Sequence, residues 1–137
     1  MKSKFSLHHI GIVVDNIENY LKNSFLSLHG NIVKDIYDKY QNARIVLISM
    51  ESPVLIELIQ PMNEKSFTYN FLKRNGNSLH HLCFKTDNIK EIDSLFEKKK
   101  IKRITPFVEA PIFNNKKVTF GYTRNKNIIE ILIDSDV

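Results

Sequence analysis

The sequence predicts an α+β fold in which two tandem βαβββ modules form a curved, eight-stranded mixed sheet. Two repeats predict it: LHHIGIVVDNI at Leu7–Ile17 returns as LHHLCFKTDNI at Leu79–Ile89, and LIELI at Leu55–Ile59 returns as IIEIL at Ile128–Leu132. The repeated segments are β-rich, and an amphipathic stretch with helical spacing follows each double histidine. Each module should therefore carry one histidine strand and one glutamate strand.

The first module is predicted to span residues 6–60. A strand over Ser6–Val14 precedes the Asp15-Asn16 pair, which can cap an amphipathic helix that ends at Gly30. The apolar face of this helix consists of Ile17, Tyr20, Leu21, Phe25 and Leu28. Three further strands, separated by polar segments with turn chemistry, are expected at Asn31–Ile36, Ala43–Ser49 and Val54–Gln60.

Residues 61–77 are predicted to connect the modules through a short helix that contains Phe67, Phe71 and Leu72 and ends at Gly76. The second module, residues 78–137, repeats the order of the first. Its elements are a strand over Leu79–Thr86, a helix after the Asp87-Asn88 cap, and strands near Lys102–Val108, Lys116–Tyr122 and Asn127–Ile133. We expect one domain over residues 1–137, because this length suffices for a single compact core.

The second histidine of each pair and each repeated glutamate are predicted to lie on the same side of the sheet. Strand side chains alternate between faces, so His9 and His81 point away from the aliphatic faces that helices should cover. The same alternation places Glu57 and Glu130 opposite those aliphatic faces. His9 precedes Glu57 by 48 positions and His81 precedes Glu130 by 49, so the four side chains can converge in the concavity of the sheet.

These four side chains are predicted to bind one divalent metal ion. A buried carboxylate without a partner is costly, so an apolar surround for Glu57 and Glu130 requires compensation. Two carboxylates and the neutral imidazoles of His9 and His81 sum to a charge of −2, which a divalent ion would cancel. Any one of these residues alone could be an ordinary sheet residue facing solvent, but their repetition at matching positions favours the metal site.

The remaining histidines and the single cysteine have simpler interpretations. His8 and His80 are expected to pack against helices, and His29 is expected in a surface loop. Cys83 has the alternation that would face the site, but a lone cysteine in an apolar strand is more often a packing residue.

Composition excludes several classes of protein. A hydrophobic share of 42% and a charged share of 26% argue against disorder, and no apolar run approaches the roughly 20 residues of a membrane span. The net charge of +5 includes one dense basic run, Lys98–Lys100, at the end of a predicted helix, without the aromatic residues of a nucleic-acid surface. One cysteine and no signal-peptide pattern predict a cytoplasmic protein that binds neither nucleic acid nor membrane.

At these residues the chain resembles the vicinal oxygen chelate superfamily, whose members pair βαβββ modules around a divalent metal. The resemblance runs from Leu7 to Ile133. Its most specific segments, LHHIGIVVDNI, ELIQPMNEKSFTYNFLKRNGNSLHHLCFKTDNI and NIIEIL, are similar to methylmalonyl-CoA epimerases and to epimerase-like or glyoxalase I-like bacterial proteins. The resemblance implies that His9, Glu57, His81 and Glu130 are the metal ligands and that the chain forms a homodimer. Three departures matter. Ile45 stands where one bacterial epimerase type has a glutamate base, the YTRNKN turn before the last strand lacks the usual Pro and Gly, and the segment before the central double histidine is less Gly-rich than usual.

The ligand set and the resemblance together imply a divalent-metal-dependent isomerase or lyase. It would abstract a proton alpha to a carbonyl or thioester through a metal-chelated enolate, with Glu130 or Glu57 as the base. Cobalt, nickel, manganese and zinc all fit such ligands. The small-molecule substrate would be a CoA thioester, whose phosphates need cations. The candidate cations are Arg44, Lys73, Arg74, Lys116 and Lys117.

Three alternatives are less favoured. A glyoxalase I-like lactoylglutathione lyase uses the same ligands but fits the connector less well. A non-catalytic small-molecule or drug-binding protein of the same fold usually lacks the full metal set. A ring-cleaving dioxygenase usually needs two histidines and one carboxylate around Fe(II).

Overall fold

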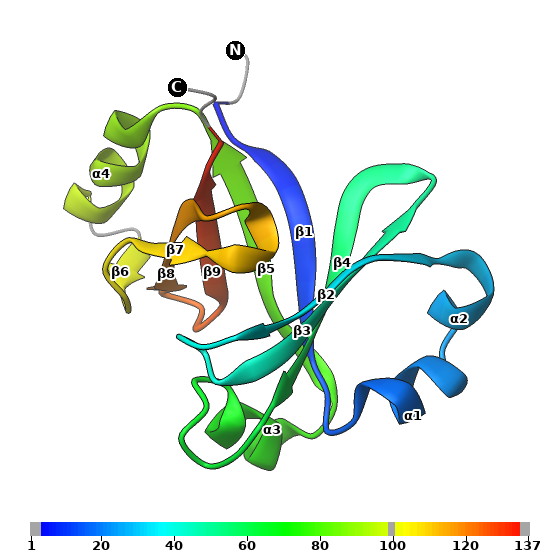
Figure 1. Cartoon of the computed structure of the whole chain (residues 1–137). Coiled ribbons are helices and arrows are strands. Elements are labelled where there is room, and N and C mark those ends of the chain that lie inside the picture. The colour runs from blue at the N-terminus through cyan, green and yellow to red at the C-terminus, as the bar shows by residue number, and fades with distance from the viewer. Residues whose placement is uncertain (1–3, 99–100, 135–137) are drawn as a thin grey trace. The chain divides into compact units, whose positions relative to one another are not determined.

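The computed structural model describes residues 4–98 and 101–134, which contain nine strands, four α-helices and one 3-10 helix. Two compact units are present: His9–His80, and the described residues of Met1–His8 together with His81–Val137. The elements (Figure 1) are β1 (Ser6–Val13), α1 (Ile17–Lys22), α2 (Leu26–His29), β2 (Asn31–Asp38), β3 (Ala43–Met50), β4 (Ser52–Pro61), α3 (Tyr69–Asn75), β5 (Ser78–Thr86), α4 (Ile89–Glu97), β6 (Ile101–Arg103), β7 (Val108–Ala110), η1 (Pro111–Phe113), β8 (Lys116–Thr123) and β9 (Ile128–Ile133). No described helix is long and apolar enough to cross a membrane.

In the unit His9–His80 the strands lie in the order β2-β3-β4-β1. β1 runs parallel to β4, whereas β3 is antiparallel to both β2 and β4. The strand that follows the helices therefore lies at the edge, and the chain returns through a meander to the first strand. This is the β-α-β-β-β order predicted for the first module.

The helical segment after β1 begins as predicted but breaks in the middle. Asn16 caps α1 by accepting a hydrogen bond from the Asn19 N–H at 2.8 Å. The predicted single helix to Gly30 was wrong, because α1 ends at Lys22 and α2 begins at Leu26. Between them, Ser24 Oγ accepts a hydrogen bond from the Leu26 N–H at 3.0 Å, a local bond that competes with helical pairing.

The break also changes which apolar residues are buried. Ile17 is buried and Tyr20 and Leu21 pack against the core, but Phe25 and Leu28 of the predicted apolar face are 68% and 79% exposed. The latter two were therefore wrongly predicted to face the core.

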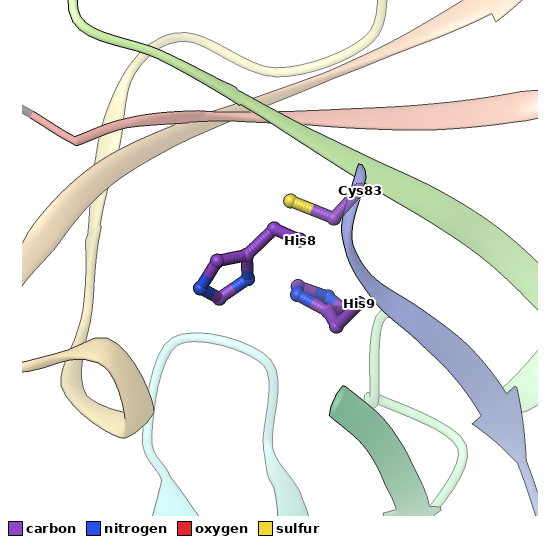
Figure 2. Close-up of side chains that lie close together, drawn as sticks. All are labelled: His8, His9 and Cys83. Carbon is purple, nitrogen blue, oxygen red and sulfur yellow. The ribbon is translucent and has the colours of Figure 1, made fainter. Parts of the chain in front are cut away.

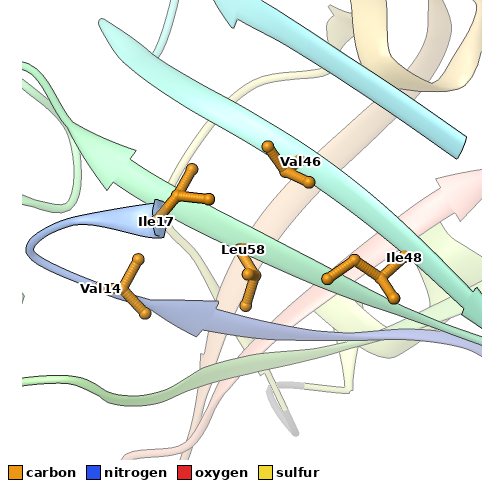
Figure 3. Packing of buried hydrophobic residues seen from close by; sticks show 5 residues of the cluster. All are labelled: Val14, Ile17, Val46, Ile48 and Leu58. Carbon is orange, nitrogen blue, oxygen red and sulfur yellow. The ribbon is translucent and has the colours of Figure 1, made fainter. Parts of the chain in front are cut away.

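The core of this unit lies between its strands and α1 and α2. Its buried members come from α1, β3, β4 and the residue after β1 (Figure 3), and they are Val14, Ile17, Val46, Ile48 and Leu58. Ile12, Tyr20, Leu21, Leu26 and Ile56 pack against them. Full burial of each aliphatic side chain is worth about 1.5–3 kcal/mol. The helices thus cover this aliphatic face, as predicted, and Glu57 lies on the opposite face.

In the second unit the strand order is β5-β9-β8-β6, and β7 also pairs with β8. β5 is parallel to β9, and Asn88 caps α4 by accepting a hydrogen bond from the Lys90 N–H at 3.0 Å.

One strand was predicted near Lys102–Val108, but the structure has two short ones, β6 and β7, that pair with different ends of β8. Pro106 lies between them and has no N–H for a sheet hydrogen bond. Of the basic run at the end of α4, Lys99 and Lys100 lie outside the described residues.

The connector contains α3, which ends at Gly76 as predicted. Gly76 has φ +66° and ψ −165°, a conformation that essentially only glycine adopts. Its N–H donates to the Leu72 carbonyl at 2.8 Å and closes the last helical turn.

The elements of the two units together confirm the predicted α+β class, with nine strands in the described residues instead of eight.

Candidate metal-binding site

His9 and Glu57 lie on adjacent parallel strands of one unit. In the register of β1 and β4, His9 is opposite Leu55 and Gly11 is opposite Glu57, so the glutamate lies two positions beyond the histidine. His9 Nε2 lies 3.7 Å from Glu57 Oε2, and the two residues are 0% and 2% exposed. The structure therefore brings this predicted nitrogen and oxygen pair together in a buried position.

His81 and Glu130 repeat this arrangement in the other unit. His81 is opposite Ile128 and Cys83 is opposite Glu130, which is the same two-position offset between parallel strands. His81 Nε2 lies 3.1 Å from Glu130 Oε1, and both residues are 2% exposed. The Phe120 ring packs edge-on against the His81 ring with centroids 5.5 Å apart, which fixes the orientation of the imidazole.

Both pairs suit a divalent cation. Carboxylates are almost never fully buried unless they are paired or bind metal, and each of these lies beside an imidazole that has nitrogen lone pairs when neutral. Imidazole nitrogen and carboxylate oxygen are ligands for zinc, and their mixture also suits other divalent first-row metals. The donor chemistry of each pair thus fits the implied ion. That both pairs hold one and the same ion stays a prediction.

The face that carries Glu57 is otherwise strongly apolar. Leu47 is opposite Glu57 across β3 and β4, and Ile45 is opposite Ile59 on the same face. Leu47 is 6% exposed, and Ile45 and Ile59 are 0% and 1% exposed. Ile45 therefore supplies no group that could accept a proton, as the sequence indicated, and the apolar walls strengthen any charge interaction made by Glu57.

The other histidines take packing positions. The His80 ring packs edge-on against Phe71, with centroids 4.7 Å apart, and is 7% exposed. The His8 ring contacts Phe113 at 4.9 Å in the same geometry, and the exposed His29 stacks on Phe25. The contacts of His8 and His80 agree with their predicted packing role. His29 is exposed as predicted, but it is the last residue of α2 and does not lie in a loop.

Cys83 is buried on β5 and close to His8. Its Sγ and a ring nitrogen of His8 lie within 4.8 Å of each other, and Figure 2 shows both side chains together with His9, the next residue along β1. The thiol donates weakly to the Phe84 carbonyl at 3.7 Å. Its burial favours packing over reactivity.

Two of the five predicted phosphate-binding cations are held by carboxylates. Arg44 makes a two-pronged contact with Asp35, at 3.0 and 2.8 Å, and also bonds Glu18. The hydrogen bonds that Arg44 donates to Asp35 and then to Glu18 raise the pKa of Arg44 above its ordinary value. Lys116 bonds Asp134, and this bond lowers the pKa of that carboxyl.

The other three predicted cations have different positions. Lys73 and Arg74 lie in the last turn of α3, and Lys117 lies on β8 opposite Glu109.

One residue that the sequence did not single out shares the face of Glu57. Lys34 of β2 is opposite Leu47, the residue that is itself opposite Glu57. No composition or spacing signal marks it, because its direction depends on an irregularity in strand pairing that only the structure reveals.

The fold and the two histidine–glutamate pairs define a class: duplicated α+β chains in which each half buries a histidine and a glutamate side by side on parallel strands. Residues 8–120 match the family model described as the Glyoxalase/Bleomycin resistance protein/Dioxygenase superfamily, and the chain belongs to this superfamily.

Several known proteins resemble the chain. The mitochondrial methylmalonyl-CoA epimerase of Dictyostelium discoideum is 27% identical over 125 residues, which cover 88% of this chain and 72% of that protein. The crystal structure of the hypothetical protein BH1468 from Bacillus halodurans C-125 has a TM-score of 0.81 at 22% identity and covers 95% of this chain and 94% of its own. A methylmalonyl-CoA epimerase in complex with methylmalonyl-CoA and NH4+ has a TM-score of 0.80 at 16% identity, covering 95% and 94% of the two chains. The likeness to these solved structures supports the fold.

Proposed function

We propose that the chain is a divalent-metal-dependent epimerase that removes and returns a proton alpha to a thioester carbonyl, most like methylmalonyl-CoA epimerase. The observation that carries the proposal is the repeated, buried histidine–glutamate pair at one and the same offset in both units. Membership in the superfamily and similarity to a methylmalonyl-CoA epimerase support the substrate class.

In this proposal His9, Glu57, His81 and Glu130 hold one ion together. If the ion were octahedral, these four residues would leave two positions for a substrate that presents two oxygens. The ion, when bound, supplies positive charge that stabilises the enolate form of the substrate, an effect worth several kcal/mol. Cobalt, nickel, manganese and zinc remain the candidates.

The protein's own contribution is to hold the carboxylates and to move the proton. Glu130 or Glu57 accepts the proton from the alpha carbon, and return of the proton to the other face of that carbon inverts its configuration. A positioned base adds about 10²- to 10⁴-fold in rate. Ile45, Leu47 and Ile59 form a buried apolar wall around Glu57, which strengthens the charge interactions of its carboxylate.

The proposal is tested by proton exchange in D₂O. The metal-loaded protein is incubated with methylmalonyl-CoA in one sample and with methylglyoxal plus glutathione in another, and deuterium at the reacting carbon is followed by NMR. We expect deuterium to enter methylmalonyl-CoA only. A Glu109→Gln variant, which changes an exposed glutamate of the same unit as Glu130, serves as the matched control and should exchange at the wild-type rate.

The other outcomes assign the protein differently. Turnover of methylglyoxal plus glutathione alone would identify a glyoxalase I-like lyase. Binding of small molecules without any exchange, in a protein that takes up no stoichiometric metal, would identify a non-catalytic binding protein.

Assembly and location belong to the same proposal. A cytoplasmic homodimer is expected from the family resemblance. Sedimentation velocity at micromolar concentration tests the dimer, and a single species of about 16 kDa would contradict it.

A further inference from the structure

β2 contains a bulge that reverses the direction of one charged side chain. Ile32 is opposite Ile48, but Lys34 is opposite Leu47, so Val33 is an extra residue without a partner on β3. If Val33 instead paired regularly with Leu47, Lys34 would lie opposite Val46, a fully buried member of the hydrophobic core. Because side chains alternate along a strand, this single inserted residue moves Lys34 to the other face of the sheet.

The face that Lys34 reaches is the face of the His9–Glu57 pair. Lys34, Leu47, Glu57 and Gly11 lie opposite one another on the four consecutive strands β2, β3, β4 and β1. Strands are spaced about 4.8 Å apart, so Lys34 and Glu57 are separated by about 10 Å at the backbone, with Leu47 between them. A long lysine side chain and a small acyl group can together span this distance.

Lys34 is also partly buried in a strand whose neighbouring positions are exposed. Asn31, Ile32 and Val33 are exposed, whereas Lys34 is half-buried. In the four strands of this unit, all of whose residues the structure describes, it is the one lysine or arginine on the face of Glu57; Arg44 lies on the opposite face with Asp35. A lysine on this face can donate a charge-assisted hydrogen bond to an anion.

We propose that Lys34 binds the carboxylate of an acyl substrate and so positions the substrate for reaction at Glu57's side of the metal site. The inference rests on the proposed function and narrows its substrate class to thioesters whose acyl group carries a carboxylate. The bulge at Val33 is the structural device that makes this contact available. Lys34 acts as a positioning residue, because proton transfer is left to the glutamates.

A plain alternative is that Lys34 and the bulge protect an edge strand. β2 lies at the end of its strand order, and lysines and bulges at such edges prevent pairing with other chains. This role requires no ligand. It predicts a change in association and no change in the recognition of a carboxylate.

The test compares two ligands that differ by one carboxylate. Binding of methylmalonyl-CoA and of propionyl-CoA to the metal-loaded protein is measured by calorimetry for the wild type, Lys34→Met, Lys34→Gln and Lys34→Arg. We expect the two neutral substitutions to weaken methylmalonyl-CoA binding about tenfold or more and to leave propionyl-CoA binding within about twofold, because a hydrogen bond to a charged group is lost only with the first ligand. Lys34→Arg should recover most of the loss. Lys39→Met, at an exposed lysine in the turn after β2, should change neither affinity.

Metal content, circular dichroism and light scattering accompany each variant. In steady-state kinetics we expect the neutral substitutions to raise KM more than they lower kcat. Equal weakening of both ligands would assign Lys34 to the CoA moiety and overturn the inference, as would unchanged affinity with increased self-association. If wild-type protein neither binds nor epimerises methylmalonyl-CoA, the proposed function fails and the inference fails with it. If the wild type is active and the Lys34 variants match its affinity and kinetics, only the inference fails.

Discussion

The imidazole Nε2 of His81 on β5 lies 3.1 Å from the Glu130 carboxylate on the parallel strand β9. His81 is opposite Ile128, so Glu130 lies two positions further along β9. His9 and Glu57 show the same offset with a separation of 3.7 Å. In each unit the pair is buried among apolar side chains, where a charge needs a partner. Each pair therefore presents a nitrogen and an oxygen donor side by side, which are donor types that divalent first-row cations bind.

The first prediction concerns metal stoichiometry. Wild-type protein should bind one cobalt ion per chain, and Glu57→Gln and Glu130→Gln should each lower the bound metal far below one equivalent, because each removes a charged ligand from the same ion. Changing a residue that only hydrogen-bonds a metal ligand costs about 10- to 100-fold in metal affinity, so loss of a ligand itself should cost at least about 100-fold. Metal analysis by mass spectrometry and visible cobalt absorption measure the effect.

His8→Ala is the matched control for that experiment, since His8 neighbours His9 but packs against Phe113. It should retain the full equivalent of metal. Two ions per wild-type chain, with only one lost in each glutamate variant, would show that the pairs act as separate sites.

The second prediction separates ligand from base. At a cobalt concentration that restores full occupancy in both glutamine variants, the variant lacking the base should remain slower than wild type by about 10²- to 10⁴-fold. The other should regain a larger share of activity, because its remaining defect is in metal binding. Deuterium exchange into methylmalonyl-CoA measures both rates, and equal recovery of both variants would argue that neither glutamate alone is the base.

The third prediction is a loss of stability in acid through the Arg44 cluster. The hydrogen bond from Arg44 lowers the pKa of Asp35 below its ordinary value of 3.8, and likewise that of Glu18 below 4.5. A carboxyl with a lowered pKa in the folded state stabilises the fold above its unfolded pKa, and this stabilisation is lost as the pH falls through the folded value. The loss should therefore begin near pH 4.5 and continue below 3.8.

Urea unfolding at pH 6 and at pH 3.5 measures this effect. Because these side chains are largely exposed, the contribution is modest. Arg44→Gln should reduce the difference between the two pH values, whereas Lys39→Gln should leave it unchanged. An undiminished pH dependence in Arg44→Gln would show that other carboxyls cause it.

The fourth prediction concerns the end of α3. Gly76→Ala should destabilise the protein by about 1–3 kcal/mol, because its backbone conformation is strained for any residue with a Cβ. No atom of the described residues lies within 4 Å of the added methyl group, so strain is the cause and a steric clash is not. Thermal or urea unfolding measures the change. Asn75→Ala, one residue earlier, should cost less, and a similar loss for both would point to the helix end in general.

Much of the fold was predictable because local chemistry and repetition agree. Asn16 and Asn88 cap their helices through the side-chain bonds that the sequence indicates, and Gly76 ends α3. The pairing of His9 with Glu57 and of His81 with Glu130 followed from the two-residue period of strands, which allows only one face for each glutamate.

Other features depend on competing local interactions or strand pairings, and the spacing of apolar residues does not predict which of them forms. The amphipathic spacing through Leu28 is genuine, but Ser24 bonds the backbone locally and ends the first helix early. The face of Lys34 depends on whether Val33 is paired or bulged, and both choices satisfy the same residue preferences. The pairing of β2 with β3 decides which face Lys34 takes, so the sequence of β2 alone does not predict it.

The boundary between the compact units falls within each double histidine, so that His8 belongs with the later part of the chain and His9 with the earlier part. Lys4 accordingly forms its ion pair with Glu91, at 2.8 Å, far along the sequence. A cut in the connector would thus separate the late fragment from a piece of its own sheet. Two such fragments should regain structure only by complementation, and a circularly permuted polypeptide would have to carry the first eight residues with the second half.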